Sequence, residues 1–166
     1  MRRFFKGRIC RFYVRVFDMK NLNLLFGTIL VVGLIAADRV LKVFATDMDY
    51  SFFNGFIELV YRQNTGIAFS IPIPVWASIL ITASLIGFGL VFVFRNFDFG
   101  NKLAIFAIAL VLAGALGNMY DRIFLGYVVD YISIWKWPVF NFADMCIFCG
   151  ALIIGVKFDK ITSGKK

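Results

Sequence analysis

Ionisable and amide side chains gather in residues 117–144, between two long apolar stretches of the sequence. The segment reads GNMYDRIFLGYVVDYISIWKWPVFNFAD, and its polar groups include Asn118, Asp121, Arg122, Asp130, Asn141 and Asp144. An ionisable group at membrane depth costs about 2.5–3.5 kcal/mol to insert, so it persists mainly where it faces a protein interior or a cavity. The segment is therefore a candidate site, and carboxylates in apolar surroundings indicate acid–base chemistry.

Asp130 and Asp144 are the two carboxylates whose setting best fits a pair that shares one proton. Asp130 lies in YVVDYI without a cationic neighbour, and Asp144 follows the uncharged PVFNFA. Two carboxylates about 4 Å apart repel by about 4 kcal/mol at an effective dielectric of about 20, so both cannot ionise freely. Aspartic proteases use such a pair to activate water and protonate the leaving amine. Asp121, beside Arg122 and one helical turn after Asn118, is predicted to be a charge-paired helix end that supports the site.

The composition is typical of a membrane protein. Of 166 residues, 61% are hydrophobic, against about 45–50% in a soluble domain. A net charge of +8 would suit a nucleic-acid binder, but such a protein would be less apolar, so we expect no nucleic-acid partner. The sequence has no histidine, which excludes Ser-His-Asp catalysis and His-ligated zinc. We expect no metal ion and no cofactor, and we interpret the C-x-x-C formed by Cys146 and Cys149 as buried and inert.

Four apolar stretches predict an all-α polytopic membrane protein with four transmembrane helices. The predicted spans are residues 21–41, 75–94, 103–120 and 139–156. A weak alternation at 57–61 predicts a small extracytoplasmic β-like segment within the first long connection, 43–71. The second long connection, 121–138, is rich in aromatic residues and is expected to be a periplasmic loop near the interface. Ala113 and Gly117 have the spacing of small residues that lets two helices approach closely.

The charges predict the orientation of these spans. Thirteen of the 18 Lys and Arg residues lie in 1–20, 95–102 and 157–166, which four spans place on one side of the membrane. The positive-inside rule makes that side, with both termini, cytoplasmic, and puts the candidate site near the outer face. We expect a basic cytoplasmic N-terminal segment (1–20) on anionic headgroups, a four-helix membrane domain (21–157) and a basic, mobile cytoplasmic tail (158–166).

Five short blocks of the sequence resemble the signature blocks of lipoprotein signal peptidases, also known as signal peptidase II. They are DRVLK (38–42), NTGIAFS (64–70), GNMYDR (117–122), GYVVDYI (126–132) and FNFAD (140–144). They occur in the family's order and extend over about residues 22–157. The resemblance implies a four-span aspartic endopeptidase of the bacterial inner membrane. It implies removal of the signal peptide from diacylglyceryl-modified prolipoproteins, just before the lipidated cysteine.

The resemblance also implies roles for individual residues and a set of partners. The family's catalytic aspartates correspond to Asp130 and Asp144. Its supporting polar residues correspond to Asp38, Lys42, Asn64, Asn118, Asp121, Arg122 and Asn141. The implied partners are prolipoprotein substrates, membrane lipid and globomycin-like inhibitors, and we expect a monomer.

Local spacing adds two expectations about the supporting residues. Asp38 and Lys42 are four residues apart, so they can pair on one helix face. A backbone amide inside a membrane is normally helical, so a peptidase must hold its substrate extended. We hypothesise that Asn64, Asn141 or the strand near 57–61 supplies the hydrogen bonds for this.

The sequence departs from the family pattern at three points. Arg39 and Leu41 stand where the family usually has polar Gln and Ser or Thr, so we expect the hydrogen bonds of those side chains to be missing. Tyr131 replaces a common Phe, which is a mild change. The link from Asp130 to Asp144 has only 14 residues, so we expect the loop that covers the substrate to differ in shape.

The main alternative is a small polytopic transporter or proton-relay membrane protein that uses Asp38, Asp130 and Asp144. A relay needs ionisable residues at several depths, whereas these carboxylates are predicted to lie at one face. A non-enzymatic scaffold would give no reason for two carboxylates in apolar surroundings. A serine intramembrane protease would normally need a histidine base, which the sequence lacks.

Overall fold

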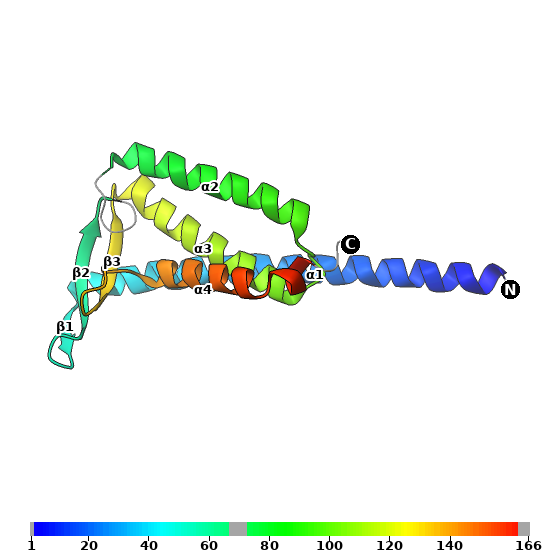
Figure 1. The fold of residues 1–166 in the computed structure, drawn as a ribbon, viewed down its shortest axis with the longest axis horizontal. Coiled ribbons are helices and arrows are strands. Elements are labelled where there is room, and N and C mark those ends of the chain that lie inside the picture. Colours follow the sequence, from blue (N-terminus) through cyan, green and yellow to red (C-terminus); the bar gives the residue numbers. More distant parts are fainter. Residues whose placement is uncertain (1, 67–72, 163–166) are drawn as a thin grey trace.

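The fold is mostly helical and includes a small antiparallel sheet (Figure 1). The computed structural model describes residues 2–66 and 73–162, with side chains from Lys20 onward. The elements in chain order are α1 Arg2–Phe44, the 3-10 turn η1 Ala45–Asp47, β1 Asp49–Phe52, β2 Ile57–Asn64, α2 Val75–Asn96, α3 Lys102–Phe124, β3 Val128–Ile134, α4 Phe142–Val156 and α5 Phe158–Thr162. The predicted helical class with a small β-like segment is confirmed at that level, and the β part is larger than predicted, because three paired strands form it.

Three helices in the described part of the chain are long and apolar enough to cross a membrane. They are Lys20–Asp47, which consists of α1 from Lys20 onward and the turn η1, and α2 and α3. Helix α4 has 15 residues, which corresponds to about 22 Å against a hydrocarbon core of about 30 Å. Three predicted spans are therefore confirmed as apolar helices of sufficient length, and the fourth span stays a prediction.

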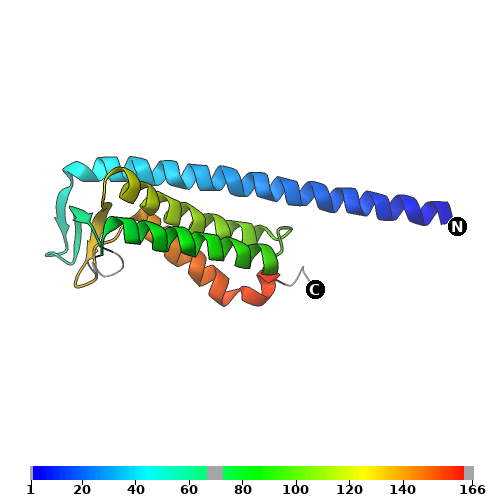
Figure 2. The ribbon, with the colours of Figure 1, turned by 90° about the horizontal axis from the view of Figure 1, so that it is seen from above.

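The helices lie side by side and the sheet lies across one end of them (Figures 1 and 2). Helix α1 runs along the bundle and continues past its other end, so the N-terminus lies far from the sheet. The sheet end is therefore where the C-terminal end of α1, the C-terminal end of α3 and the start of α4 meet. These are the chain segments that carry most of the predicted site residues.

Glycine residues allow α3 and α4 to approach closely. A Cβ added at Gly114 would lie 2.2 Å from the carbonyl oxygen of Ala143, and one added at Gly150 would lie 2.8 Å from the carbonyl oxygen of Ala107. The predicted close approach at 113 and 117 is therefore found one position away, at Gly114. Gly117 serves a different contact, because a Cβ there would lie 2.9 Å from Asp38 Oδ2 on α1.

The sheet has the order β1-β2-β3, with both strand pairs antiparallel. The strand predicted at 57–61 is confirmed as part of β2. The segment 121–138 is not simply a loop as predicted, because α3 continues to Phe124 and residues 128–134 form β3. The β2–β3 register shifts between Leu59 and Arg62, and beyond that shift β3 carries Asp130 opposite Arg62.

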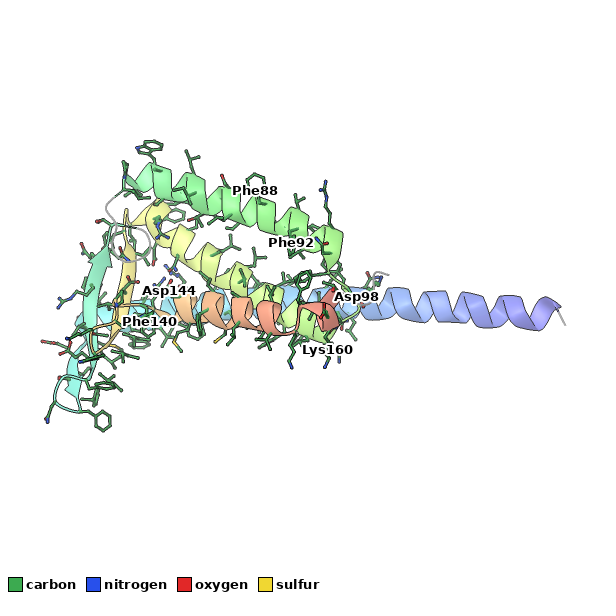
Figure 3. The ribbon with its side chains drawn as sticks, in the orientation of Figure 1. Phe88, Phe92, Asp98, Phe140, Asp144 and Lys160 are labelled. Atoms are coloured by element: carbon green, nitrogen blue, oxygen red, sulfur yellow. The ribbon has the colours of Figure 1, made fainter. Side chains whose placement is uncertain are left out.

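At the end of the bundle opposite the sheet, the short helix α5 packs against the start of α3. The side chains of Phe97, Ala104 and Ile161 are fully buried together, and the Asp98 amide donates a 3.0 Å hydrogen bond to the Ile161 carbonyl. Asp98 and Lys160 both lie at this end, far from Asp144 (Figure 3). The prediction of a mobile tail is wrong for residues 158–162, because Ile161 anchors them, and residues 163–166 lie outside the described part.

Candidate active site

The ends of α1 and α3 are joined by a cluster of two carboxylates and two cations. Lys42 Nζ lies 3.0 Å from Asp38 Oδ2 on its own helix and 2.8 Å from Asp121 Oδ2 on α3. The predicted pairing of Asp38 with Lys42 is thus confirmed. Asp38, Lys42 and Asp121 are all buried, and opposite charges at these distances offset the cost of removing them from water.

The predicted pairing of Asp121 with Arg122 is wrong. Asp121 is paired with Lys42 and with Arg39, whereas Arg122 donates hydrogen bonds to the carbonyl oxygens of Asn118 and Gly66 at 3.4 and 3.3 Å. Adjacency in the sequence therefore does not decide the partner of Asp121, which is set by how α1 packs against α3. Arg122 instead reaches toward the end of β2.

Arg39 makes more hydrogen bonds to the charge cluster than its position in the sequence suggested. Its guanidinium donates to Asp38 Oδ2 at 2.5 Å, to Asp121 Oδ1 and to the Gly117 carbonyl at 3.2 Å, and lies 4.9 Å from the centre of the Tyr120 ring. The expectation that hydrogen bonding is lost at this position is therefore wrong. The available signal was the rarity of an arginine in an apolar helix, which marks a buried partner.

Beside this cluster, three asparagines and two aspartates form a second hydrogen-bonded group. Asn141 Nδ2 donates to Asp130 Oδ1 at 2.6 Å and to Asn118 Oδ1 at 3.1 Å. Asn118 Nδ2 donates to Asp144 Oδ1 at 2.7 Å, and Asn64 Nδ2 donates to Asp130 Oδ2 at 2.8 Å. The structure thus brings β2, β3, α3 and α4 together at two carboxylates.

Local structure explains why Asn141 and Asp144 hold each other. Asn141 is the N-cap of α4: its Oδ1 accepts from the Asp144 amide at 2.9 Å. Asp144 Oδ2 in turn accepts from the Asn141 amide at 3.1 Å. This reciprocal capping box satisfies two amides that a helix start otherwise leaves unpaired. It fixes the Asp144 side chain at the first turn of α4.

The two groups of polar residues are connected through Lys42. Lys42 Nζ donates to Asn118 Oδ1 at 3.0 Å, in addition to its two carboxylate contacts. Asn118 therefore receives hydrogen bonds from Lys42 and Asn141 on one side of its amide and donates to Asp144 from the other. The charge cluster thereby orients the amide that contacts Asp144.

The side chain of Asp130 is a weaker acid than an ordinary aspartate side chain. Its side chain lies on β3 and the residue is 3% exposed. Burial raises the pKa of Asp130 to about 6, the nearby Asp144 carboxylate acts in the same direction, and the hydrogen bonds from Asn64 and Asn141 oppose it. A carboxyl group with such a pKa can hold or release a proton under mild conditions.

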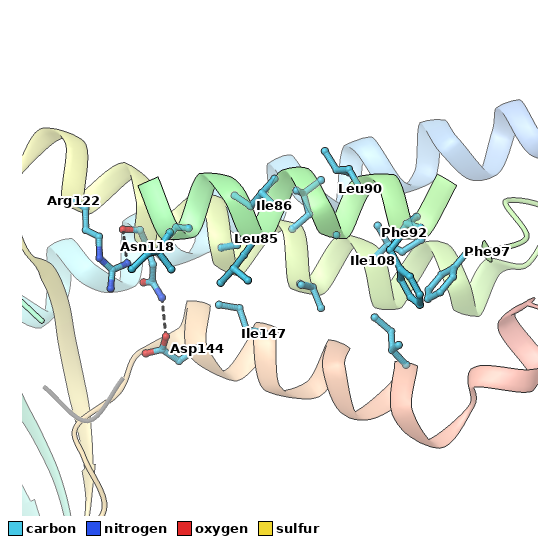
Figure 4. A pocket seen from close by; sticks show the side chains of 18 residues that line it. Leu85, Ile86, Leu90, Phe92, Phe97, Ile108, Asn118, Arg122, Asp144 and Ile147 are labelled. Atoms are coloured by element: carbon cyan, nitrogen blue, oxygen red, sulfur yellow. Dashed lines mark hydrogen bonds between the residues drawn. The ribbon is translucent and has the colours of Figure 1, made fainter. Parts of the chain in front are cut away.

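An elongated cleft of about 590 Å³ runs between α2, α3 and α4 and reaches this group (Figure 4). Asn118, Arg122 and Asp144 lie at its end near the sheet, with the hydrogen bond from Asn118 to Asp144 at its wall. The remainder is lined by apolar side chains that include Leu85, Ile86, Leu90, Phe92, Phe97, Ile108 and Ile147. The lining also includes Thr82, so an apolar molecule lying in the cleft would meet charged groups only at the sheet end.

The family model described as "Signal peptidase (SPase) II" matches residues 29–159 of the chain. The chain belongs to the signal peptidase II family. The predicted resemblance is thereby confirmed, and the alternative of a transporter or proton-relay protein is not favoured. All nine predicted site residues lie within the matched segment.

Curated relatives and solved structures agree with membership in the signal peptidase II family. The chain is 36% identical over 140 residues to the lipoprotein signal peptidase of Clostridium acetobutylicum, covering 77% of this chain and 90% of the relative. It is 38% identical over 143 residues to that of Francisella tularensis subsp. novicida, covering 76% and 86%. A bacterial membrane enzyme solved by the in meso method at 2.3 Å superposes with a TM-score of 0.72 at 28% identity, over 85% of this chain and 92% of that one.

For this member of the signal peptidase II family, the structure gathers every predicted site residue at the sheet end of the bundle. Asp130 and Asp144 lie in the group with Asn64, Asn118 and Asn141. Asp38, Lys42 and Asp121 form the neighbouring charge cluster. Arg122 lines the cleft at its end near the sheet. Within the NTGIAFS block, residues 67–70 lie outside the described part of the chain.

The prediction that both cysteines of the C-x-x-C are buried holds for one of them. Cys146 is buried, in agreement with the interpretation, but Cys149 is exposed on the outer face of α4. Three positions along a helix bring a side chain to within about 60° of the first one, so Cys146 and Cys149 are neighbours on α4 and the boundary between its buried and exposed surface runs between them. Among the described residues, no three His, Cys, Asp or Glu side chains gather as a metal site.

Proposed function

We propose that the chain is an aspartic endopeptidase in which Asp130 and Asp144 form the catalytic pair. The observation that carries this proposal is that one residue, Asn141, contacts both carboxylates. Its side chain donates to Asp130 at 2.6 Å and its backbone amide donates to Asp144 at 3.1 Å. Burial raises the pKa of Asp130 to about 6, so Asp130 retains a proton more readily than an exposed aspartate.

In the proposed reaction, one carboxylate is ionised and the other is protonated. The ionised group takes a proton from water as the water oxygen bonds to the scissile carbonyl carbon. The protonated group donates a hydrogen bond to the carbonyl oxygen, and a proton passes to the leaving nitrogen as the C–N bond breaks. The products are a carboxylic acid and an amine, which become a carboxylate and an ammonium group by proton exchange with water, and the pair again holds one proton. Asn64, Asn118 and Asn141 keep the two carboxyl groups oriented.

The proposed substrate is a prolipoprotein whose cysteine carries a diacylglyceryl group, with cleavage just before that cysteine. The cleft between α2, α3 and α4 supports this choice, because it is mostly apolar along its length and carries charged groups only at Arg122 and Asp144, beside Asn118. Ligand clefts are typically apolar with a few placed polar groups. A signal-peptide helix with acyl chains would lie along the apolar part and bring its scissile bond to the polar end.

The roles proposed for the asparagines are narrower than the hypothesis drawn from the sequence. Asn64 donates to Asp130 and accepts from the Gly66 amide at 3.0 Å. Asn141 is engaged in the α4 cap and in the contact with Asp130. We therefore assign both residues to positioning the carboxylates. The third candidate, the strand near 57–61, lies in the central strand β2, where residues 57–60 pair with β1 and β2 also pairs with β3. We propose that the substrate backbone binds β2 beyond Val60, where β1 no longer pairs with it.

The proposed setting is the bacterial inner membrane, with α4 as the fourth span and both termini in the cytoplasm. The excess of Lys and Arg outside the sheet end supports this orientation. It places the sheet and the catalytic pair at the outer face, where a translocated signal peptide ends. We further propose that the enzyme acts as a monomer within lipid and is inhibited by globomycin-like peptides.

The decisive test is cleavage of a diacylglyceryl-modified prolipoprotein by the purified protein in detergent micelles. Asp130→Asn and Asp144→Asn are each expected to abolish cleavage while the unfolding temperature stays close to that of the wild type. Asp159→Asn, on exposed α5, is the matched control and should retain full activity. Chelators should leave the rate unchanged and globomycin should abolish it. Wild-type cleavage by either site variant would refute the proposed pair.

A further inference from the structure

One face of the small sheet is apolar across all three strands. In a sheet, residues paired across strands point to the same face, and neighbours along a strand point to opposite faces. The register therefore defines two apolar cross-strand rows, Tyr50–Leu59–Ile132 and Phe52–Ile57–Ile134. The row between them on the other face is polar, Ser51–Glu58–Ser133. The sheet is thus amphipathic.

The apolar face leads to a group of exposed aromatic residues at the far end of the sheet. We name this group the aromatic rim; it consists of Tyr50, Phe52, Phe53, Phe56, Trp135 and Trp137. All six are exposed, with Phe53 at 80% and Trp135 at 68%. The two turns that carry the rim are tied together, because the Trp135 amide donates to the Phe56 carbonyl at 2.8 Å. Contiguous exposed apolar surface of this kind marks an interaction site.

Two residues of the aromatic rim are held in a backbone conformation that bulky side chains avoid. Phe53 has φ 53° and Trp135 has φ 48°, both in the left-handed region. A bulky residue with positive φ is rare, and Gly or Asn is preferred there. Burial in a core does not offset the backbone strain at these two residues, because both side chains are exposed. Strained residues of this kind are retained mainly at functional sites, and an exposed one indicates a contact outside the protein.

The position of the aromatic rim relative to the helices indicates what it contacts outside the protein. The β1–β2 hairpin projects past the side of the bundle, away from α2, at the level where the helices end (Figures 1 and 3). The cleft proposed for the substrate is lined by α2, whereas the β1–β2 hairpin lies on the side of the bundle away from α2 (Figure 1). A part of a membrane protein that overhangs its helices at this level lies above lipid.

We propose that the aromatic rim inserts into the headgroup region of the membrane leaflet on the side of the sheet. Aromatic side chains are enriched at this boundary, where a ring can contact acyl chains while polar atoms stay hydrated. Lys136, whose Nζ lies 5.3 Å from the centre of the Trp135 ring, extends from the same turn and can reach lipid phosphates. Only the identity of that leaflet rests on the proposed orientation.

Insertion of the aromatic rim would set the depth of the catalytic pair. Asp130 lies on β3, four residues before Ile134, where β3 reaches the rim turns. A sheet anchored in lipid at the aromatic rim and in the bundle at Asn141 has two fixed ends. Asp130 would then stay at one level relative to the headgroups, which is the level at which a diacylglyceryl group places its neighbouring peptide bond.

The test uses tryptophan fluorescence of the full chain in phosphatidylcholine vesicles, without substrate. The chain has three tryptophans, so Trp76→Phe with Trp137→Phe leaves Trp135 as the reporter. Trp135→Phe with Trp137→Phe leaves Trp76, at the start of α2, as an interface reference. We expect lipids brominated near the headgroup to quench Trp135 as strongly as Trp76. Iodide present on both sides should quench Trp135 several-fold less than free tryptophan amide.

Phe53→Gly separates lipid anchoring from a structural role. Glycine relieves the strain at φ 53°, so the unfolding temperature should stay equal or rise, whereas quenching of Trp135 by brominated lipid should fall. Strong iodide quenching of Trp135 without bromolipid quenching would overturn the proposal. Quenching of Trp135 by neither agent would assign the aromatic rim to a protein partner and would also overturn the proposal. Bromolipid quenching that appears only with added substrate would assign the aromatic rim to the substrate site, with the same consequence. Because no cleavage is measured, this result is independent of the catalytic pair.

Discussion

Replacing Asn64 by leucine should change the pH dependence of cleavage in a defined direction. Asn64 Nδ2 donates a 2.8 Å hydrogen bond to Asp130 Oδ2, and this bond stabilises the ionised carboxylate. Burial raises the pKa of Asp130 to about 6 against the opposing effect of this bond and of the bond from Asn141. Leucine has a similar size but no donor, so Asn64→Leu removes one of the two hydrogen-bond donors that favour ionisation of Asp130.

The size of the shift can be worked out from the remaining contacts. A hydrogen bond to a charged group contributes about 1.5–3 kcal/mol, and about 1.36 kcal/mol corresponds to one pKa unit. The lower end applies, because Asp130 keeps the 2.6 Å bond from Asn141. The pKa of Asp130 should therefore rise by about one unit. The pair needs one proton, so activity falls as pH rises through that pKa, and the alkaline limb should move to higher pH by about one unit.

The assay is kcat/KM for a diacylglyceryl-modified prolipoprotein as a function of pH, in detergent micelles. Asn101→Ala is the matched control, because Asn101 caps α3 at the opposite end of the bundle and accepts from the Leu103 amide at 2.9 Å. Its profile should keep the wild-type alkaline limb. An unmoved limb in Asn64→Leu, or a shift to lower pH, would show that the Asp130 proton does not control cleavage. Equal unfolding temperatures of the variants would exclude a general loss of structure.

Three buried contacts of the bundle give further predictions, each measured as unfolding in detergent micelles. Gly114→Ala should be strongly destabilising, because the new Cβ would lie 2.2 Å from a backbone oxygen of α4, whereas Gly87→Ala has nothing within 4 Å and should be tolerated. Lys42→Met should lower the free energy of unfolding by about 3–5 kcal/mol. Arg39→Gln should lower it less, because the Lys42 side chain is 3% exposed and that of Arg39 is 24% exposed. Equal losses in the two variants would contradict this ranking. Ile161→Ala should cost about 2–5 kcal/mol if α5 is anchored by its fully buried side chain, and an unchanged unfolding temperature would show that it is not.

The parts of the structure that follow from local spacing could be predicted from the sequence. The pairing of Asp38 with Lys42 depends only on a separation of four residues on one helix. Three of the apolar helices follow from the length of uninterrupted hydrophobic sequence. The family blocks locate the segments that meet at the sheet end, because each block carries polar residues at an apolar boundary.

The parts that depend on contacts between distant segments could not be predicted. Arg39 and Asp121 are 82 residues apart, and the choice of Arg39 over the adjacent Arg122 depends on how α1 and α3 pack. Strand β3 reads VVDYISI and is buried on both faces over its first four residues, so it lacks the alternation that identifies a half-exposed strand. The exposure of Cys149 depends on the rotation of α4, which a continuous apolar sequence does not specify.

Asn141 has a consequence for how long the protein keeps its proposed activity. The same residue begins α4 and contacts both carboxylates, so opening the first turn of α4 would separate Asp144 from Asp130 while the rest of the bundle stays intact. Helix ends open at a lower free energy than whole domains unfold. Heating should therefore inactivate the protein reversibly below its unfolding temperature, and a ligand that bridges both carboxylates should close this gap.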